Sequence, residues 1–341
     1  MSVTARPVRC QQRFAVIATL ELNRSGKDER FSKVKSAGGH RMPSMQVTPH
    51  PLLGVACVMV AAMLWGTTGT SQALAGGSLS ALWFGALRLL FAALFFFVFA
   101  SATGALNRRA WEGLPLSAAI GAGLCMAAYN LSFFAGVKLA GVGIGTAIAL
   151  GSGPIWAGVL QAVFQRQPPT RAWWVGTVVA IAGGVLLSMG GGSQSASPLG
   201  IALCLGSGLS YAVYTLLNQR MVSHAPASSI TLAAFGVAAL VALPMAAFQA
   251  GWPSLDMRDL TAVIYTGTVT AGVGYLLFSF ALHHVRPATA VTLALTEPVV
   301  AFILAVLLLN EPTSIAAFSG LALVVTGVLG VVRSELSIQR K

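Results

Sequence analysis

Charged residues are scarce in this sequence. Of its 341 residues, 9% are Asp, Glu, Lys or Arg and 56% are hydrophobic, which gives a mean hydropathy of +0.78. So little charge cannot cover the surface of a water-soluble protein of this length, and most of the chain must therefore face lipid. The apolar stretch at residues 51–333 has room for ten helices of about 20 residues with short loops, and it leaves none for a separate soluble domain.

Motifs of enzymes and metal centres are absent as well. The sequence has no GxxxxGK[ST] phosphate-binding loop, no HExxH, no GxSxG and no acid–base pair suited to catalysis in its apolar segments. ATP hydrolysis by this chain is thereby excluded, and we expect no enzyme activity. The four cysteines (Cys10, Cys57, Cys125 and Cys204) have no CxxC or metal-type spacing, so we expect reduced, packed thiols, no metal and no cofactor.

Ten apolar segments are bounded by Gly, Pro, Ser or charged residues, which predicts an all-α integral membrane protein with ten transmembrane helices. These helices are expected at residues 51–73, 80–102, 114–136, 140–164, 172–190, 198–219, 228–250, 260–282, 287–309 and 313–333. Residues 1–50 are interpreted as a disordered basic cytoplasmic tail, with a true start at Met42 or Met45 as the alternative. Residues 334–341 are interpreted as a cytoplasmic C-terminal tail.

Positive charge is distributed unevenly among the connections. Nine Lys and Arg residues lie in residues 1–50, and further ones follow on alternate connections. The inner side carries Arg108, Arg109, Arg166, Arg171, Arg220, Arg286, Arg333, Arg340 and Lys341, and the outer side carries Lys138 and Arg258. Because Lys and Arg are retained on the cytoplasmic side of membranes, both termini are predicted to be cytoplasmic in a plasma or inner membrane. Orientation explains the net charge of +12 without a nucleic-acid partner.

The two halves of the chain repeat one another. A shift of 144 residues places residues 146–187 on 290–331 without a gap, and a shift of 146 aligns the first helix of each half. The matches include Pro154 with Pro298, Gly176 with Gly320, Gly183 with Gly327 and, at the second shift, Trp65 with Tyr211. This predicts two five-helix repeats at residues 51–190 and 198–333. Because five is odd, the second repeat must be inverted, as in secondary transporters with a site at the membrane midplane.

Two ionisable residues lie well inside the predicted helices. Burying either charge in lipid costs about 2.5–3.5 kcal/mol on insertion scales, so Arg88 and Glu297 should face the protein interior or a wet cavity. For Arg88, a structural ion pair or an outward-reaching side chain is the alternative. Glu297 precedes Pro298, and a broken helix beside a carboxylate suits a substrate amine or a coupling proton. The alternative is a protonated Glu297 bonded to a neighbouring helix. Its repeat mate is Gly153.

Further polar side chains are candidates for contact with a small-molecule substrate. With Glu297 they are Trp65, Tyr129, Asn130, Tyr211 and Thr296. Hydroxyls in membrane helices most often bond their own backbone, so each has a purely structural alternative, whereas the Asn130 amide needs a partner. Pro154 and Pro298 are predicted to break the fourth and ninth helices. The cavity is expected to be lined by the first, third, fourth, sixth, eighth and ninth helices.

Taken together, these residues resemble the EamA-type branch of the drug/metabolite transporter superfamily over about residues 52–333. The motifs that carry the resemblance are Leu64-Trp65-Gly66, Leu87-Arg88, Pro154, Glu297-Pro298 and Leu307-Leu308-Leu309-Asn310-Glu311. Gln167 stands where the first repeat usually has a glutamate matching Glu311. The resemblance implies a plasma-membrane carrier, often an exporter of amino acids or other small metabolites. We expect alternating access with efflux favoured; an uptake carrier, a channel, and a membrane sensor or assembly protein are the alternatives.

Overall fold

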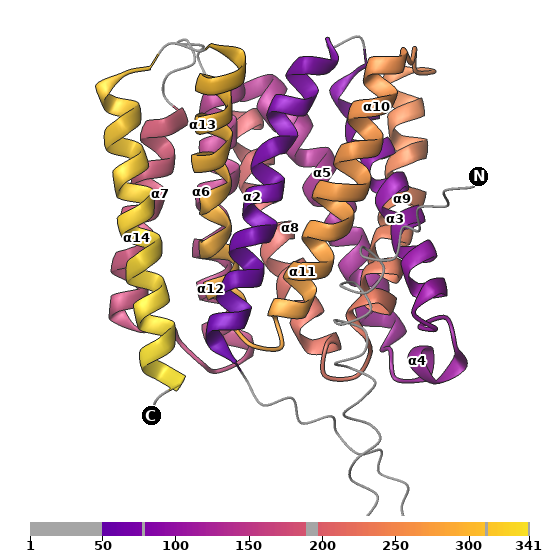
Figure 1. Cartoon of the computed structure of the whole chain (residues 1–341), viewed down its shortest axis with the longest axis horizontal. Helices are drawn as coiled ribbons and strands as arrows, with labels where there is room; N and C mark the ends of the chain where they lie inside the picture. Colours follow the sequence, from indigo (N-terminus) through magenta and orange to yellow (C-terminus); the bar gives the residue numbers. More distant parts are fainter. Residues whose placement is uncertain (1–49, 77–78, 189–196, 311–312, 340–341) are drawn as a thin grey trace, which may run out of the picture. The chain divides into compact units, whose positions relative to one another are not determined.

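The computed structural model describes residues 50–76, 79–188, 197–310 and 313–339 (Figure 1). Apart from His50, the predicted N-terminal tail and its alternative starts lie outside the described residues, as does Glu311. The described residues form helices and connections and contain no strand. Among them, nine helices are long and apolar enough to cross a membrane, and Arg171–Leu187 is a shorter apolar helix. This part of the chain therefore has the helical composition of a multi-pass membrane protein.

The helices follow one another along the chain with short connections. The first half contains α2 (Pro51–Ala75), α3 (Ala81–Ala102), the short α4 (Arg108–Glu112), α5 (Leu116–Ala140), α6 (Val142–Phe164) and α7 (Arg171–Ser188). The second half contains α8 (Pro198–Met221), α9 (Ala227–Ala250), α10 (Met257–Tyr265), a π-helical segment η1 (Thr266–Val273) and α11 (Gly274–Ala281). It continues with α12 (Pro287–Leu293), a 3₁₀ turn η2 (Ala294–Thr296), α13 (Glu297–Leu309) and α14 (Ile315–Gln339).

Local sequence explains where several of these helices begin and end. Pro51, Pro198 and Pro287 each stand in the first turn of a helix, where the missing N–H would have no helical partner. The hydroxyl of Ser80 accepts a hydrogen bond from the Trp83 N–H and caps α3. Gly76 ends α2 with a φ of 95°, a left-handed conformation that glycine adopts without strain. The predicted boundaries accordingly agree with the observed ones to within a few residues at most positions.

The C-terminal helix is longer than predicted. Instead of ending near residue 333, α14 continues to Gln339, so the predicted end of this helix is too early. The reason is that the last turns have buried polar partners. The Ser334 and Thr170 hydroxyls lie 2.6 Å apart in a hydrogen bond, and the Thr289 hydroxyl donates to the Glu335 carboxylate at 2.6 Å. Polar residues that suggested a solvated tail are therefore helix contacts.

The two prolines predicted to break helices lie in different local structure. α6 runs as a single α-helix through Pro154, whereas the segment before Pro298 changes from α12 to the 3₁₀ turn η2 before α13 begins. The prediction for Pro154 is thus wrong. The physical reason is close packing of α6 on α8: a Cβ on Gly208 would lie 2.8 Å from the Ala149 carbonyl oxygen. This contact supports α6 on the N-terminal side of the proline.

The glycines that match between the halves form a contact between α7 and α14. A Cβ on Gly176 would lie 2.8 Å from the Gly327 carbonyl oxygen, and one on Gly183 would lie 2.6 Å from the Gly320 oxygen. Gly176 thus contacts the repeat mate of Gly183, and Gly183 contacts the repeat mate of Gly176. This crosswise pairing requires α7 and α14 to run antiparallel. Small residues at such a crossing let two helix backbones approach closely.

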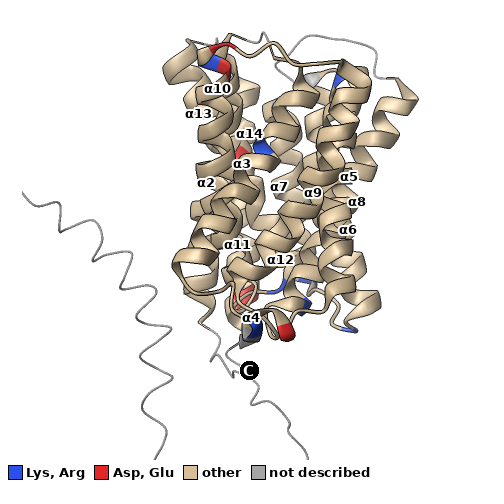
Figure 2. Ribbon diagram, turned by 90° about the vertical axis from the view of Figure 1, so that its right-hand side faces the viewer, with Lys and Arg blue, Asp and Glu red and all other residues tan. Residues whose placement is uncertain are grey.

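The two ends of the bundle differ from its middle in charge. α2 begins and α14 ends at the same end, the lower one in Figure 1. Charged residues gather at the ends of the helices and few lie between them (Figure 2). In the middle, α2 packs against α11 and α13 of the second half. This central packing surrounds the candidate site.

Candidate functional site

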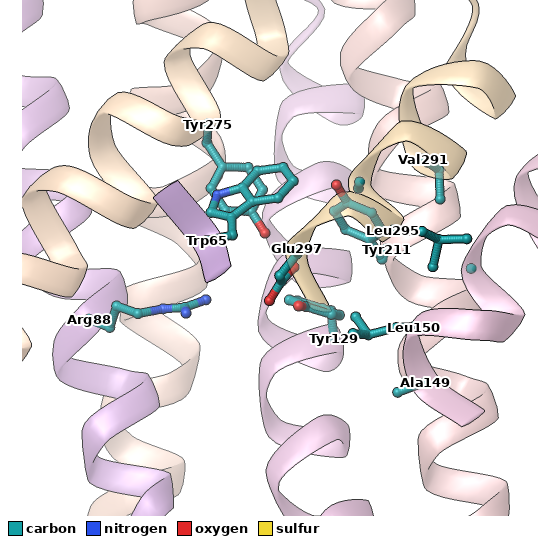
Figure 3. A pocket seen from close by; sticks show the side chains of 12 residues that line it. Trp65, Arg88, Tyr129, Ala149, Leu150, Tyr211, Tyr275, Val291, Leu295 and Glu297 are labelled. Carbon is teal, nitrogen blue, oxygen red and sulfur yellow. The ribbon is translucent and has the colours of Figure 1, made fainter. Parts of the chain in front are cut away.

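A small cavity lies between the two halves of the chain (Figure 3). Its lining residues are Trp65, Arg88, Tyr129, Ala149, Leu150, Gly153, Tyr211, Tyr275, Val291, Ala294, Leu295 and Glu297. They come from all six helices expected from the sequence and from α3, which supplies Arg88. The cavity volume is about 40 Å³, which is room for about three waters. A metabolite therefore requires the lining side chains to move apart.

Four of the lining side chains are aromatic. The rings of Trp65 and Tyr275 have centroids 4.8 Å apart, those of Tyr129 and Tyr211 5.3 Å, and those of Trp65 and Tyr211 6.4 Å. Trp65 and Tyr211 are repeat mates at an offset of 146 residues, and Tyr129 and Tyr275 have the same offset. Each half thus contributes one ring to each pair. Aromatic faces of this kind attract an ammonium group and pack on apolar groups.

The glycines beside Trp65 explain how this bulky side chain reaches the cavity. A Cβ on Gly274 would lie 2.7 Å from the Trp65 Nε1, so only glycine lets α11 pass the indole at this distance. A Cβ on Gly66 would lie 2.8 Å from the Glu297 carbonyl oxygen, which places α2 directly against the start of α13. The Leu64-Trp65-Gly66 motif therefore combines a cavity side chain with a close helix contact.

One positive and one negative side chain face the cavity from different halves. Arg88 extends from α3, and Glu297 is the first residue of α13, directly after the 3₁₀ turn η2. Arg88 and Glu297 do not form an ion pair within 4.0 Å. The ion pair found among the described residues joins Arg108 to Glu112, at 2.8 Å. Arg88 and Glu297 therefore line the same cavity without forming an ion pair with each other.

Three donors at the cavity are buried without a partner. The Trp65 Nε1, the Arg88 Nε and the Tyr211 hydroxyl have no hydrogen-bond partner among the described residues. Leaving a buried donor unsatisfied costs about 1–3 kcal/mol, and native structures contain few such groups. These three donors share one cavity, where a polar ligand or water can complete them. This is the clearest physical sign of a binding site in the described residues.

The remaining predicted site residues lie elsewhere. Asn130 is buried, 2% exposed, and its side chain occupies the place that a Cβ on Gly85 would need. The Thr296 hydroxyl donates to the Met59 sulfur at 3.4 Å. Neither lines the cavity, and Pro298 lines a separate, smaller one.

Tyr275 lines the cavity but is not among the site residues predicted from the sequence. The signal that identifies it is its offset of 146 residues from Tyr129. The same offset relates Trp65 to Tyr211, so the repeat extends to the third helix of each half.

Comparison with known proteins identifies the family. The sequence matches the EamA-like transporter family over residues 52–189 and again over 198–333. The chain belongs to this family. The uncharacterized transporter YwfM of Bacillus subtilis is 36% identical over 275 residues, which cover 80% of this chain and 91% of that protein. The threonine/homoserine exporter RhtA of Salmonella typhimurium is 29% identical over 226 residues, or 64% of this chain and 71% of that protein.

Membership of the EamA-like family agrees with the helical structure. A solved crystal structure matches with a TM-score of 0.71 at 18% identity, covering 85% of this chain and 100% of the other, which shows a shared fold. This EamA-like protein is a multi-pass membrane transporter of small molecules in the drug/metabolite transporter superfamily.

Proposed function

We propose that this EamA-like protein is a secondary transporter that exports a small metabolite, an amino acid or a similar compound, across the plasma membrane by alternating access. The observation that carries the proposal is the cavity at which the Trp65, Arg88 and Tyr211 donors lack partners. Its walls come from both repeats, as a site that opens alternately to either side requires. The relatives named threonine/homoserine exporters support both the substrate class and the direction.

The proposed topology has ten transmembrane helices in two inverted repeats, at residues 51–190 and 198–333, with both termini cytoplasmic. The tenth crossing is α7, which is apolar but shorter than the other nine. The antiparallel glycine contact between α7 and α14 supports the inversion. The excess of Lys and Arg on the connections at one side supports the orientation.

In this proposal Glu297 receives the cationic part of the substrate and Arg88 receives the anionic part. The four aromatic rings surround the site and are related by the repeat, so they present a similar wall to either side. The two charges have no such relation, because Gly153 stands at the repeat position of Glu297. Any proton coupling would therefore belong to the second repeat.

The test is counterflow in proteoliposomes that contain the purified full-length protein. Liposomes loaded with unlabelled L-threonine or L-leucine are diluted into the labelled amino acid, and saturable accumulation is expected for a carrier. Glu297→Gln and Arg88→Gln should each lower the rate at least about tenfold, because each leaves one charge of the substrate unpaired. Glu112→Gln and Arg108→Gln, which change the ion pair of α4, are the matched controls.

Two results would contradict the proposal. Flux that does not saturate and shows no counterflow would indicate a channel, and wild-type rates in both cavity variants would reject the site. Repeating the assay with an imposed pH gradient separates the two roles of Glu297. If a proton is coupled, the gradient drives accumulation in the wild type and has no effect on the residual transport of Glu297→Gln.

A further inference from the structure

The cavity has two chemically different ends. Figure 3 shows Arg88 on one side of Glu297 and Leu150, Val291 and Leu295 on the other. The second group adds only aliphatic surface to the wall. A ligand that satisfies both ends therefore carries charged groups at one end and an apolar group at the other.

Gly153 lies at the apolar end, on α6. A Cβ built on it would lie 3.4 Å from the Val291 Cγ1 and 4.0 Å from both the Tyr211 Cδ1 and the Gly208 carbonyl oxygen. These are ordinary van der Waals distances, so a methyl group fits here without displacing its neighbours. Glycine at this position is thus not demanded by helix packing, in contrast to Gly208, whose Cβ would lie 3.0 Å from the Gly153 nitrogen.

The repeat shows what is special about this position. Gly153 and Glu297 are mates at the offset of 144 residues, and both line the cavity. One half therefore projects a carboxylate into the site, and the other half projects no side chain from the matching place. Next to the repeat-related aromatic rings, the cavity therefore has a charged side chain at Glu297 and open space at Gly153 for part of the substrate.

We propose that Gly153 opens a subsite for an apolar side chain of the substrate, walled by Leu150, Tyr211, Val291 and Leu295, and that it limits the size of that side chain. This rests on the proposed function, because it requires the central cavity to be the substrate site. The substrate class is a small zwitterion with an aliphatic side chain, its ammonium at Glu297 and its carboxylate at Arg88.

The test uses four probes in the counterflow assay: L-alanine, L-valine, L-leucine and L-threonine. Valine and threonine have nearly the same shape, so wild-type preference for valine, expected at about tenfold or more, reports an apolar subsite. Gly153→Ala adds one methyl group and should lower transport of leucine relative to alanine by about tenfold or more, since one methylene changes discrimination by about 10–200-fold. Gly153→Val should extend the loss to valine.

Gly236→Ala is the matched control, because it makes the same change in α9 at a place where a Cβ has no neighbour within 4 Å. It should leave the ranking of the four probes unchanged. Gly153→Ala should melt at or above the wild-type temperature, because alanine favours the helix and its methyl group meets no clash, which excludes misfolding as the cause.

The outcomes separate the subsite from the proposed function. If the wild type exchanges these amino acids but prefers threonine to valine, or if Gly153→Ala lowers leucine and alanine transport equally or not at all, the subsite is rejected and the carrier function stands. If the wild type exchanges none of the four, the proposed amino-acid substrate is rejected and the subsite with it.

Discussion

Two tyrosines three residues apart on α8 should respond in opposite ways to loss of their hydroxyl groups. Tyr211 lines the cavity, and its hydroxyl has no partner among the described residues. Tyr214 is fully buried, and its hydroxyl accepts a hydrogen bond from Asn218 Nδ2 at 3.0 Å. Comparing variants of the two tyrosines therefore distinguishes a hydroxyl that is available to a ligand from one that bonds within the fold.

The magnitudes follow from these partners. Tyr211→Phe removes a buried hydroxyl without breaking an internal hydrogen bond, so the melting temperature should stay the same or rise. If the substrate bonds this hydroxyl, transport should fall by about two- to twelvefold, which corresponds to about 0.5–1.5 kcal/mol. Tyr214→Phe removes an acceptor of Asn218, whose amide keeps its bond to Ser279 at 2.7 Å, so it should cost about 1 kcal/mol of stability.

The assay pairs thermal melting of the purified variants with initial counterflow rates at substrate concentrations below KM. This difference between the two hydroxyl groups predicts slower transport at undiminished stability for Tyr211→Phe, and lower stability at nearly unchanged transport for Tyr214→Phe. This prediction would be refuted if Tyr211→Phe lowered the melting temperature as much as Tyr214→Phe does. It would also be refuted if Tyr211→Phe transported like the wild type.

Two further predictions concern the helix contacts and pH. Gly183→Ala should destabilise the α7–α14 contact by about 1–3 kcal/mol, because its Cβ would lie 2.5 Å from the Val324 nitrogen. The control Gly184→Ala, whose Cβ meets nothing within 4 Å, should not destabilise this contact. Equal melting temperatures of the two variants would contradict the close packing at Gly183. Burial, followed by His283 and His50, holds the pKa of His284 below its ordinary value of 6.5. The folded state thus binds a proton at His284 less well than the unfolded state does. The stability of the folded state should therefore be full above pH 6.5 and fall as the pH drops below it. Melting curves of wild type and His284→Gln between pH 5 and 8 should diverge only on the acid side.

The positions of the helices and several of the residues at the site follow from the amino-acid sequence alone. Lipid admits only segments whose backbone groups bond internally and whose side chains are apolar, so composition and length are enough to locate them. Arg88 and Glu297 stood out because charge inside such a segment is costly. The repeat offsets added Trp65 and Tyr211.

The direction in which each side chain faces depends on how the helices pack in the folded protein. Tyr129 and Asn130 are neighbours on α5, yet Tyr129 lines the cavity and Asn130 lies against Gly85 of α3. Their direction depends on the rotation of the helix about its axis, which packing against other helices sets. The same reason explains why Ser334 and Glu335 extend α14 through bonds to Thr170 and Thr289. The polarity of a residue determines how much free energy its exposure to lipid costs. Whether it finds a hydrogen-bond partner instead depends on the helices that pack beside it.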